Sequence, residues 1–151
     1  MGNGPLSGKI SFVVIQKLVF NMIGFLIVAH GAFGEALIHS ASHVMGSRPL
    51  YLRQLGVTVH DDPEALLPQA RDLLRFVDQG DGVIIFSDIC GATPCNIAGK
   101  LLVPGKVEGI AGVSLPMLVR ALTYRNMVLN DVVAKAKSGG SEGVTPIPAV
   151  K

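Results

Sequence analysis

Two polar residues directly follow long apolar runs, and together they could carry out nucleophilic chemistry. His30 follows the run of residues 23–29, and Asp88 follows residues 83–87. A neutral imidazole can accept a proton, bind a metal or take up a phosphoryl group. A carboxylate bonded to one ring nitrogen fixes the tautomer, leaves the other nitrogen nucleophilic and stabilises positive charge on the ring.

Glycine-containing segments follow both residues and could bind an anion. Gly91, Ala92 and Thr93 stand just before a predicted helix start, where backbone amides and a hydroxyl group favour a phosphate. Gly31 and Gly34 would let the backbone approach closely on the other side. The pattern is that of a nucleophilic imidazole, an orienting carboxylate and a phosphate cradle. An ordinary strand-to-helix loop is the alternative interpretation, because a lone glycine-rich loop is a weak signal.

The elements that must position these residues alternate between strands and helices. Apolar runs predict strands over residues 23–29, 50–59, 83–87 and 107–113. Helical spacing and capping signals predict helices over residues 35–45, from 61 or 62 to 77, from the DICGATPCN segment through 102, from 116 to 124, and over 128–137.

Prolines and glycines set the expected limits of two of these helices and of the C-terminal tail. Pro68 is expected to confine the regular part of its helix to the second half. Gly139 and Gly140 are expected to end the last helix. The proline-rich tail beyond them could add one short edge strand around Gly143–Thr145.

Strands that alternate with helices predict an α/β fold, a mostly parallel doubly wound sheet in the order 2-1-3-4 with helices on both faces. In such sheets, chemistry gathers outside the carboxyl ends of the strands, where the strand order reverses. We therefore expect His30 and Asp88 to face each other across that crevice.

Composition limits the class of protein. The 151 residues fit one domain, and the 49% of hydrophobic residues argues against disorder. The net charge of +2 is spread without a basic run, and there is no Trp, so a nucleic-acid partner is not expected. Cys90 and Cys95 are the only cysteines, and we expect them to be reduced thiols in the cytoplasm rather than a structural disulfide.

The N-terminal segment needs its own interpretation. Residues 10–29 have the length of a membrane span, but Gln16, Lys17 and Asn21 interrupt the run where polar groups are costly. The segment also lacks the basic start and cleavage site of a signal peptide. We therefore expect residues 1–21 to be an extension outside the domain, which residues 22–151 form.

Three separated stretches carry a family resemblance that covers about residues 22–145. In chain order they are LIVAHGAFGEAL, GVIIFSDICGATPCNIAGKLL and VEGIAGVSLPMLVRAL. They resemble the enzyme IIA domains of mannose-family sugar phosphotransferase systems. Three ordered blocks are far more specific than any one of them.

The resemblance implies a phosphoryl carrier. The phosphorylated histidine of the family matches His30, its orienting aspartate matches Asp88, and its phosphate-site hydroxyl residue matches Thr93. Such domains accept phosphate from HPr and pass it to a IIB component, which serves a IIC/IID membrane permease. The family needs no metal and no organic cofactor. It forms a homodimer with an exchanged short strand, which suits Gly143–Thr145.

Some residues depart from the family pattern. Ile89 and Cys90 stand where many relatives have a threonine and an aromatic residue, Ala92 replaces a common glycine, and Cys95 replaces a bulky residue. Two alternative functions stay open: a regulatory module whose phosphorylation state signals nutrient supply, and a phosphodonor domain for a dihydroxyacetone kinase. The transported sugar is not encoded here, because the membrane subunits select it.

Three other groups of residues have simpler interpretations than a functional one. Glu35, His39 and His43 share a helix face with metal-ligand chemistry but lack a converging ligand, so a solvated face is preferred. A redox role for the two cysteines is disfavoured because their spacing is not Cys-x-x-Cys. Isolated arginines could contact phosphoprotein partners but are more often solubilising; they are Arg48, Arg53, Arg120 and Arg125.

Overall fold

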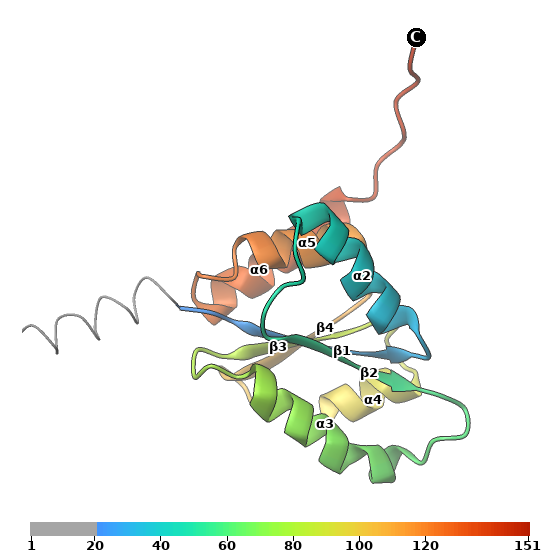
Figure 1. Cartoon of the computed structure of the whole chain (residues 1–151), viewed down its shortest axis with the longest axis vertical. Coiled ribbons are helices and arrows are strands. Elements are labelled where there is room, and N and C mark those ends of the chain that lie inside the picture. The colour runs from blue at the N-terminus through green and yellow to red at the C-terminus, as the bar shows by residue number, and fades with distance from the viewer. Residues whose placement is uncertain (1–20) are drawn as a thin grey trace, which may run out of the picture.

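A four-stranded parallel sheet forms the centre of the computed structural model, which describes residues 21–151 (Figure 1). Its strands are β1 (Gly24–His30), β2 (Leu52–Val57), β3 (Val83–Ser87) and β4 (Val107–Ala111). They lie in the order β2-β1-β3-β4, and each neighbouring pair is parallel. The predicted α/β class and strand order are confirmed.

Helices cover both faces of the sheet. One face carries α2 (Phe33–Met45), α5 (Leu115–Thr123) and α6 (Leu129–Glu142), and the opposite face carries α3 (Pro63–Val77) and α4 (Thr93–Gly99) (Figure 1). Within residues 21–151, no helix has the length and apolar character needed to cross a membrane.

The side chains of the two central strands divide between two hydrophobic clusters. Phe25 and Ile27 of β1 pack beneath α2 and α5, together with Phe86 of β3, and the Phe25 and Phe86 ring centroids lie 5.5 Å apart. Leu26 and Val28 point to the opposite cluster beneath α3 and α4. Every residue of β3 is buried, as a continuous apolar run predicts for a strand covered on both faces.

The register of β1 against β3 places the two candidate residues at one level. Val28 of β1 pairs with Ser87, the last residue of β3. Asp88 therefore leaves the sheet at the level of Ala29, one residue before His30. Because the strands are parallel, both residues emerge at the carboxyl edge of the sheet.

The expectation that Pro68 limits α3 to its second half is wrong. The helix is continuous from Pro63, and Asp62 caps it by accepting a hydrogen bond from Glu64 N. Pro68 cannot donate to the carbonyl of Glu64, but that residue is exposed, so water can reach the group. Packing of the apolar side on the sheet, with Ala70 and Val77 buried, keeps the rest of the helix in place.

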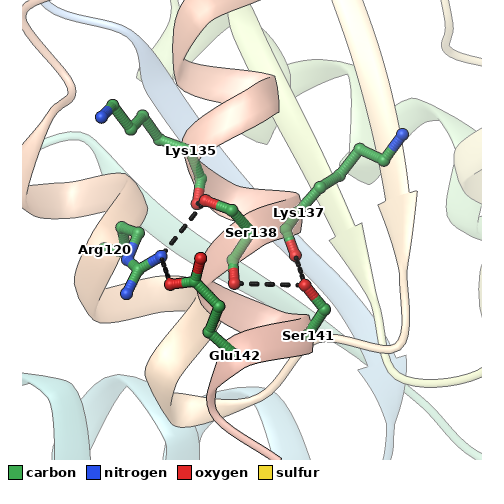
Figure 2. Close-up of polar contacts among 6 residues, drawn as sticks. All are labelled: Arg120, Lys135, Lys137, Ser138, Ser141 and Glu142. Atoms are coloured by element: carbon green, nitrogen blue, oxygen red, sulfur yellow. Dashed lines mark hydrogen bonds and ion pairs between the residues drawn. The ribbon is translucent and has the colours of Figure 1, made fainter.

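The expectation that Gly139 and Gly140 end the last helix is also wrong, because α6 continues through both to Glu142. The glycines bring α6 close to α5. A Cβ on Gly139 would lie 2.8 Å from Cβ of Arg120. Figure 2 shows how polar groups join the same two helices: Arg120 Nη1 donates to Ser138 Oγ at 3.2 Å and pairs with Glu142.

The ends of other elements differ from expectation by a few residues. Among these, α4 ends at Gly99 rather than near 102, and β2 and β4 are shorter than the apolar runs that predict them. Gly143 caps α6, and residues 144–151 extend away from the domain without regular structure in the single chain (Figure 1). The exchanged C-terminal strand stays a prediction.

The proposed N-terminal extension lies almost entirely outside the described residues, which begin at Asn21. Asn21 Nδ2 donates to Met127 O at 2.9 Å, and Ile23 N donates to Arg125 O at 3.0 Å. The boundary between extension and domain stays a prediction.

Arg125 is not a solubilising surface residue, as its isolation in the sequence suggests, but a buried one. Its guanidinium donates to the carbonyl oxygens of Ile23 at 2.7 Å and Leu50 at 2.7 Å, and it lies over the Phe25 ring. Burial lowers the pKa of Arg125 to about 10, which still leaves it charged at neutral pH. The side chain therefore joins the start of β1 to the loop before β2.

The close contact between α5 and α6 predicts opposite effects at two adjacent glycines. In Gly139→Ala, the new methyl group meets Arg120 Cβ at 2.8 Å and Pro116 O at 3.0 Å. Overpacking costs about 1–3 kcal/mol, which outweighs the gain of about 1 kcal/mol in helix propensity. Urea unfolding should show a lower free energy of unfolding.

Gly140→Ala is the matched control. Its new methyl group meets only Met117 closely, at the mobile Cε atom, so the helix-propensity gain should dominate and stability should be unchanged or higher. Equal effects of the two substitutions would contradict the proposed role of Gly139.

Candidate functional site

His30 is the last residue of β1 and stands at the carboxyl edge of the sheet. Gly31 follows with φ +51°, a left-handed conformation that turns the chain toward α2 and that disfavours other residues. The N–H of Gly31 donates to Val57 O at 2.9 Å. This turn is therefore tied to β2, and the Gly31 amide is already used within the sheet.

Asp88 contacts His30 through one carboxylate oxygen. Asp88 Oδ2 accepts a hydrogen bond from the His30 backbone N–H at 3.0 Å and lies 2.8 Å from His30 Nδ1. The other oxygen, Oδ1, accepts from the backbone N–H of Ile89 at 3.0 Å. Both oxygens are therefore held, and the carboxylate in turn fixes the orientation of the imidazole ring.

These contacts favour the ionised form of Asp88. Partial burial raises the pKa of its carboxyl group, but hydrogen bonds from the backbone and ring of His30, and then from Ile89, outweigh burial. The pKa of Asp88 is consequently below its ordinary value, and the group is a carboxylate at neutral pH. A carboxylate only accepts hydrogen bonds, so the proton between the two side chains belongs to Nδ1.

The second ring nitrogen, Nε2, keeps its lone pair in that tautomer. The His30 side chain is 53% exposed, whereas that of Asp88 is 14% exposed. The nucleophilic side of the imidazole is thus open to another molecule, with the carboxylate behind the ring. This arrangement suits attack on an electrophile that another molecule delivers.

The other predicted anion-binding residues lie in the loop from Asp88 to α4. Gly91 has φ +85°, Ala92 is the N-cap residue of α4, and Thr93 is its exposed first residue. Ala92 supplies no side-chain cap, and the first N–H groups of a helix have no partner within the helix. The loop therefore leads from the carboxylate to the start of α4, where Thr93 has a backbone N–H, Pro94 has none and the Asn96 N–H donates to Ala92 O.

Two residues that sequence reasoning did not select also shape the site. A Cβ on Gly56 of β2 would lie 2.3 Å from Gly31 O, so only glycine permits the close approach of the two backbones there. Ile89 supplies the amide that holds Asp88 Oδ1. A backbone amide carries no sequence signal, and a single glycine at a strand end is too common to be diagnostic.

The alternative metal-ligand stripe on α2 does not converge. Glu35 instead pairs with Arg48, at 3.0 Å between Oε1 and Nη1. Over residues 21–151, the structure gathers no group of three or more His, Cys, Asp or Glu side chains that could hold a metal ion. His39 and His43 are exposed on the helix.

The fold and the site together define a class of protein: doubly wound α/β domains that present a carboxylate-backed histidine at the carboxyl edge of a parallel sheet. Comparison with known proteins identifies the family. Residues 24–137 match the family model EIIA-man, described as the PTS system fructose IIA component. The chain belongs to this family and is a mannose-family IIA component of the phosphotransferase system (PTS).

Individual relatives agree with this assignment. The chain is 30% identical over 130 residues to the mannose-specific EIIAB component of the PTS from Escherichia coli K12, which covers 84% of the chain. The chain spans 40% of the length of that relative.

Solved structures share the fold at lower identity. The EIIA component from Streptococcus agalactiae has a TM-score of 0.73 at 23% identity, covering 83% of this chain and 97% of its own. The mannose/sorbose-specific IIA subunit from Enterococcus faecalis has a TM-score of 0.75 at 19% identity, covering 86% and 98%.

The Asp88 contact predicts the tautomer of the His30 ring. In ¹⁵N-edited NMR under conditions where the imidazole is neutral, His30 should carry its proton on Nδ1. Asp88→Ala should shift it toward the Nε2–H form, because the acceptor at 2.8 Å is lost. The exposed His39 should be the same in both proteins, and an Nε2–H ring in the unsubstituted protein would contradict the assignment.

Proposed function

We propose that this chain is a phosphoryl carrier of a sugar phosphotransferase system, and that His30 accepts the phosphoryl group. The donor is phospho-HPr, and the acceptor is a IIB component that supports sugar uptake. The observation that carries the proposal is the 2.8 Å contact between His30 Nδ1 and Asp88 Oδ2 on a ring that is otherwise half exposed. Membership of the EIIA-man family supports it.

The proposed reaction is a reversible transfer between two nitrogen atoms. His30 Nε2 attacks the phosphorus atom of the donor phosphohistidine, a new N–P bond forms, and the donor N–P bond breaks with its electron pair returning to the donor ring. The His30 ring keeps its Nδ1 proton and gains positive charge. Asp88, which is ionised before the reaction, stabilises that charge without taking the proton.

The phosphate-binding residues in this proposal are Gly31, Gly91, Ala92 and Thr93. Thr93 offers a hydroxyl group and its backbone N–H at the start of α4, and Gly91 and Ala92 form the turn that leads to it, with no large side chain to block the approach. Gly31 contributes differently, because its amide is used by Val57: it places the turn beside His30 without a side chain to block the approach.

The partner proteins are expected to dock at the carboxyl edge of the sheet. Phe33 and Ile89 are exposed apolar residues close in sequence to His30 and Asp88, and exposed apolar groups near a reacting centre suit protein contacts. The carrier is proposed to work in the cytoplasm and to reach the membrane only through the IIC/IID permease.

We also propose a homodimer completed by strand exchange. β4 lies at one edge of the sheet, where Val103 already pairs with its first residue, Val107, and an edge strand is a template for another strand along the rest of its length. Gly143 closes α6, so the exchanged segment would begin at Val144 rather than at Gly143.

Phosphoryl transfer from phosphoenolpyruvate through enzyme I and HPr tests the carrier chemistry. Mass spectrometry should find one acid-labile phosphoryl group on the protein and none on His30→Ala. His39→Ala, which removes an exposed histidine of α2, is the matched control and should be labelled fully. Full labelling of His30→Ala would overturn the proposal.

Asp88→Asn should be labelled more slowly in the same assay. A hydrogen bond to a charged group contributes about 1.5–3 kcal/mol, which corresponds to a rate loss of roughly 10- to 100-fold. An unchanged rate would remove Asp88 from the mechanism. Adding candidate acceptors then distinguishes a IIB protein from a dihydroxyacetone kinase or a purely regulatory target.

A further inference from the structure

The loop between Asp88 and α4 contains both cysteines of the chain, and the structure brings them together. Cys90 is exposed in the loop, and Cys95 is half-buried in the first turns of α4. Cys90 and the backbone N–H of Gly91 are near enough to Cys95 to act on the pKa of its thiol in opposite directions: Cys90 raises it and the Gly91 N–H lowers it. The chain segment that joins the two sulfur atoms is the segment that contains Gly91, Ala92 and Thr93.

Both cysteines also line one cavity. It has a volume of about 200 Å³ and lies between β3, β4 and α4, with walls that are mainly apolar. Ser87, the residue before Asp88, contributes to the same walls. The cavity gives the two thiols room to change rotamer.

We propose that Cys90 and Cys95 form a reversible intramolecular disulfide on exposure to a hydroperoxide, and that this bond slows phosphoryl transfer at His30. The first part stands on the cavity that both cysteines line, an arrangement that their spacing in the sequence, which is not Cys-x-x-Cys, does not indicate. The second part rests on the proposed carrier function. The pair is thus a modification site within the phosphate-binding loop.

The chemistry needs one equivalent of hydroperoxide. The Cys90 thiolate attacks the peroxide oxygen, the O–O bond breaks, and Cys90 becomes a sulfenic acid while the hydroperoxide is reduced to water or an alcohol. The Cys95 sulfur then attacks the Cys90 sulfur, the S–O bond breaks, and water leaves with the Cys95 proton. A dithiol reductant restores both thiols by exchange.

The order of the two steps follows from the surroundings of each thiol. Cys90 is exposed and is reached first. Burial raises the pKa of the Cys95 thiol, and although the Gly91 N–H lowers it, Cys90 and Asp88 raise it further. Cys95 is therefore less readily ionised than an ordinary thiol and reacts poorly with peroxide itself, and it attacks the Cys90 sulfenic acid as the thiolate that forms when its proton leaves.

The bond would act on the site through the short loop. A covalent link between residues 90 and 95 closes a ring that contains the proposed phosphate-binding residues. It also moves Cys90 toward α4, and Cys90 directly follows Ile89, whose N–H donates to Asp88 Oδ1. A displacement of about 1 Å at a reacting centre has effects on the order of 100-fold. We expect the oxidised protein to be labelled roughly 10- to 100-fold more slowly than the reduced protein.

The test treats the full chain with hydrogen peroxide and makes three measurements on the same sample. Intact mass and peptide mapping should show the loss of two hydrogen atoms and a Cys90–Cys95 link. Phosphoryl transfer from phospho-HPr should slow and recover after dithiothreitol. The His30 ring resonance in ¹⁵N-edited NMR should shift on oxidation and return on reduction.

Cys90→Ser/Cys95→Ser is the control variant, since neither side chain belongs to the proposed phosphate-binding set. It should be labelled at the reduced rate with and without peroxide, which separates the disulfide from methionine oxidation. Each single serine variant should also form no intramolecular link.

Three results would count against the proposal. Sulfinic acid on Cys90 without a Cys90–Cys95 link would overturn the modification site. A disulfide that leaves the labelling rate and the His30 resonance unchanged would overturn the coupling to the site. If the reduced protein takes up no phosphate at all, the carrier function fails instead, and the His30 resonance alone then decides whether the disulfide reaches the site.

Discussion

One carboxylate oxygen, Oδ2 of Asp88, connects the end of β1 to the end of β3 and sets the chemistry of the site. It accepts the His30 backbone N–H at 3.0 Å and faces Nδ1 of the same residue at 2.8 Å. The first contact holds the position of the histidine and the second holds its ring. Neither contact would exist without a parallel β1–β3 pair, because only parallel neighbours bring both carboxyl ends to one edge. The sheet order is therefore the condition on which the proposed function depends.

Much of the fold could be predicted from local patterns. The continuous apolar runs of β1 and β3 and the alternation of strands with helices are enough to predict a parallel sheet, since a strand buried on both faces needs helices on both sides. Local sequence patterns could not predict where tertiary packing keeps a helix continuous through a proline or a glycine. Pro68 remains inside α3, and α6 continues through Gly139 because that glycine permits close contact with Arg120 of α5. Such contacts depend on a partner far away in the sequence.

The candidate site, like the fold, could be predicted from the sequence only in part. His30 and Asp88 could be selected because each follows an apolar strand, and Thr93 because it begins a helix. The residues that escaped selection act through the backbone. Gly56 matters for a close approach to Gly31, and Ile89 for its amide. Outside the site, at the start of β1, Arg125 was noticed in the sequence but interpreted as a surface residue, whereas it holds carbonyl oxygens in the interior. An arginine isolated in a sequence looks the same whether it faces solvent or is buried, so only the three-dimensional contacts distinguish the two.

The central claim is that Nε2 of His30 receives the phosphoryl group while Asp88 holds Nδ1. The most direct measurement is ³¹P and ¹⁵N NMR of the phosphorylated chain labelled with ¹⁵N-histidine. The account predicts coupling between phosphorus and Nε2, and a proton retained on Nδ1. Phosphorus coupled to Nδ1 would contradict it, because that nitrogen could not carry a phosphoryl group and keep its 2.8 Å contact with the Asp88 carboxylate.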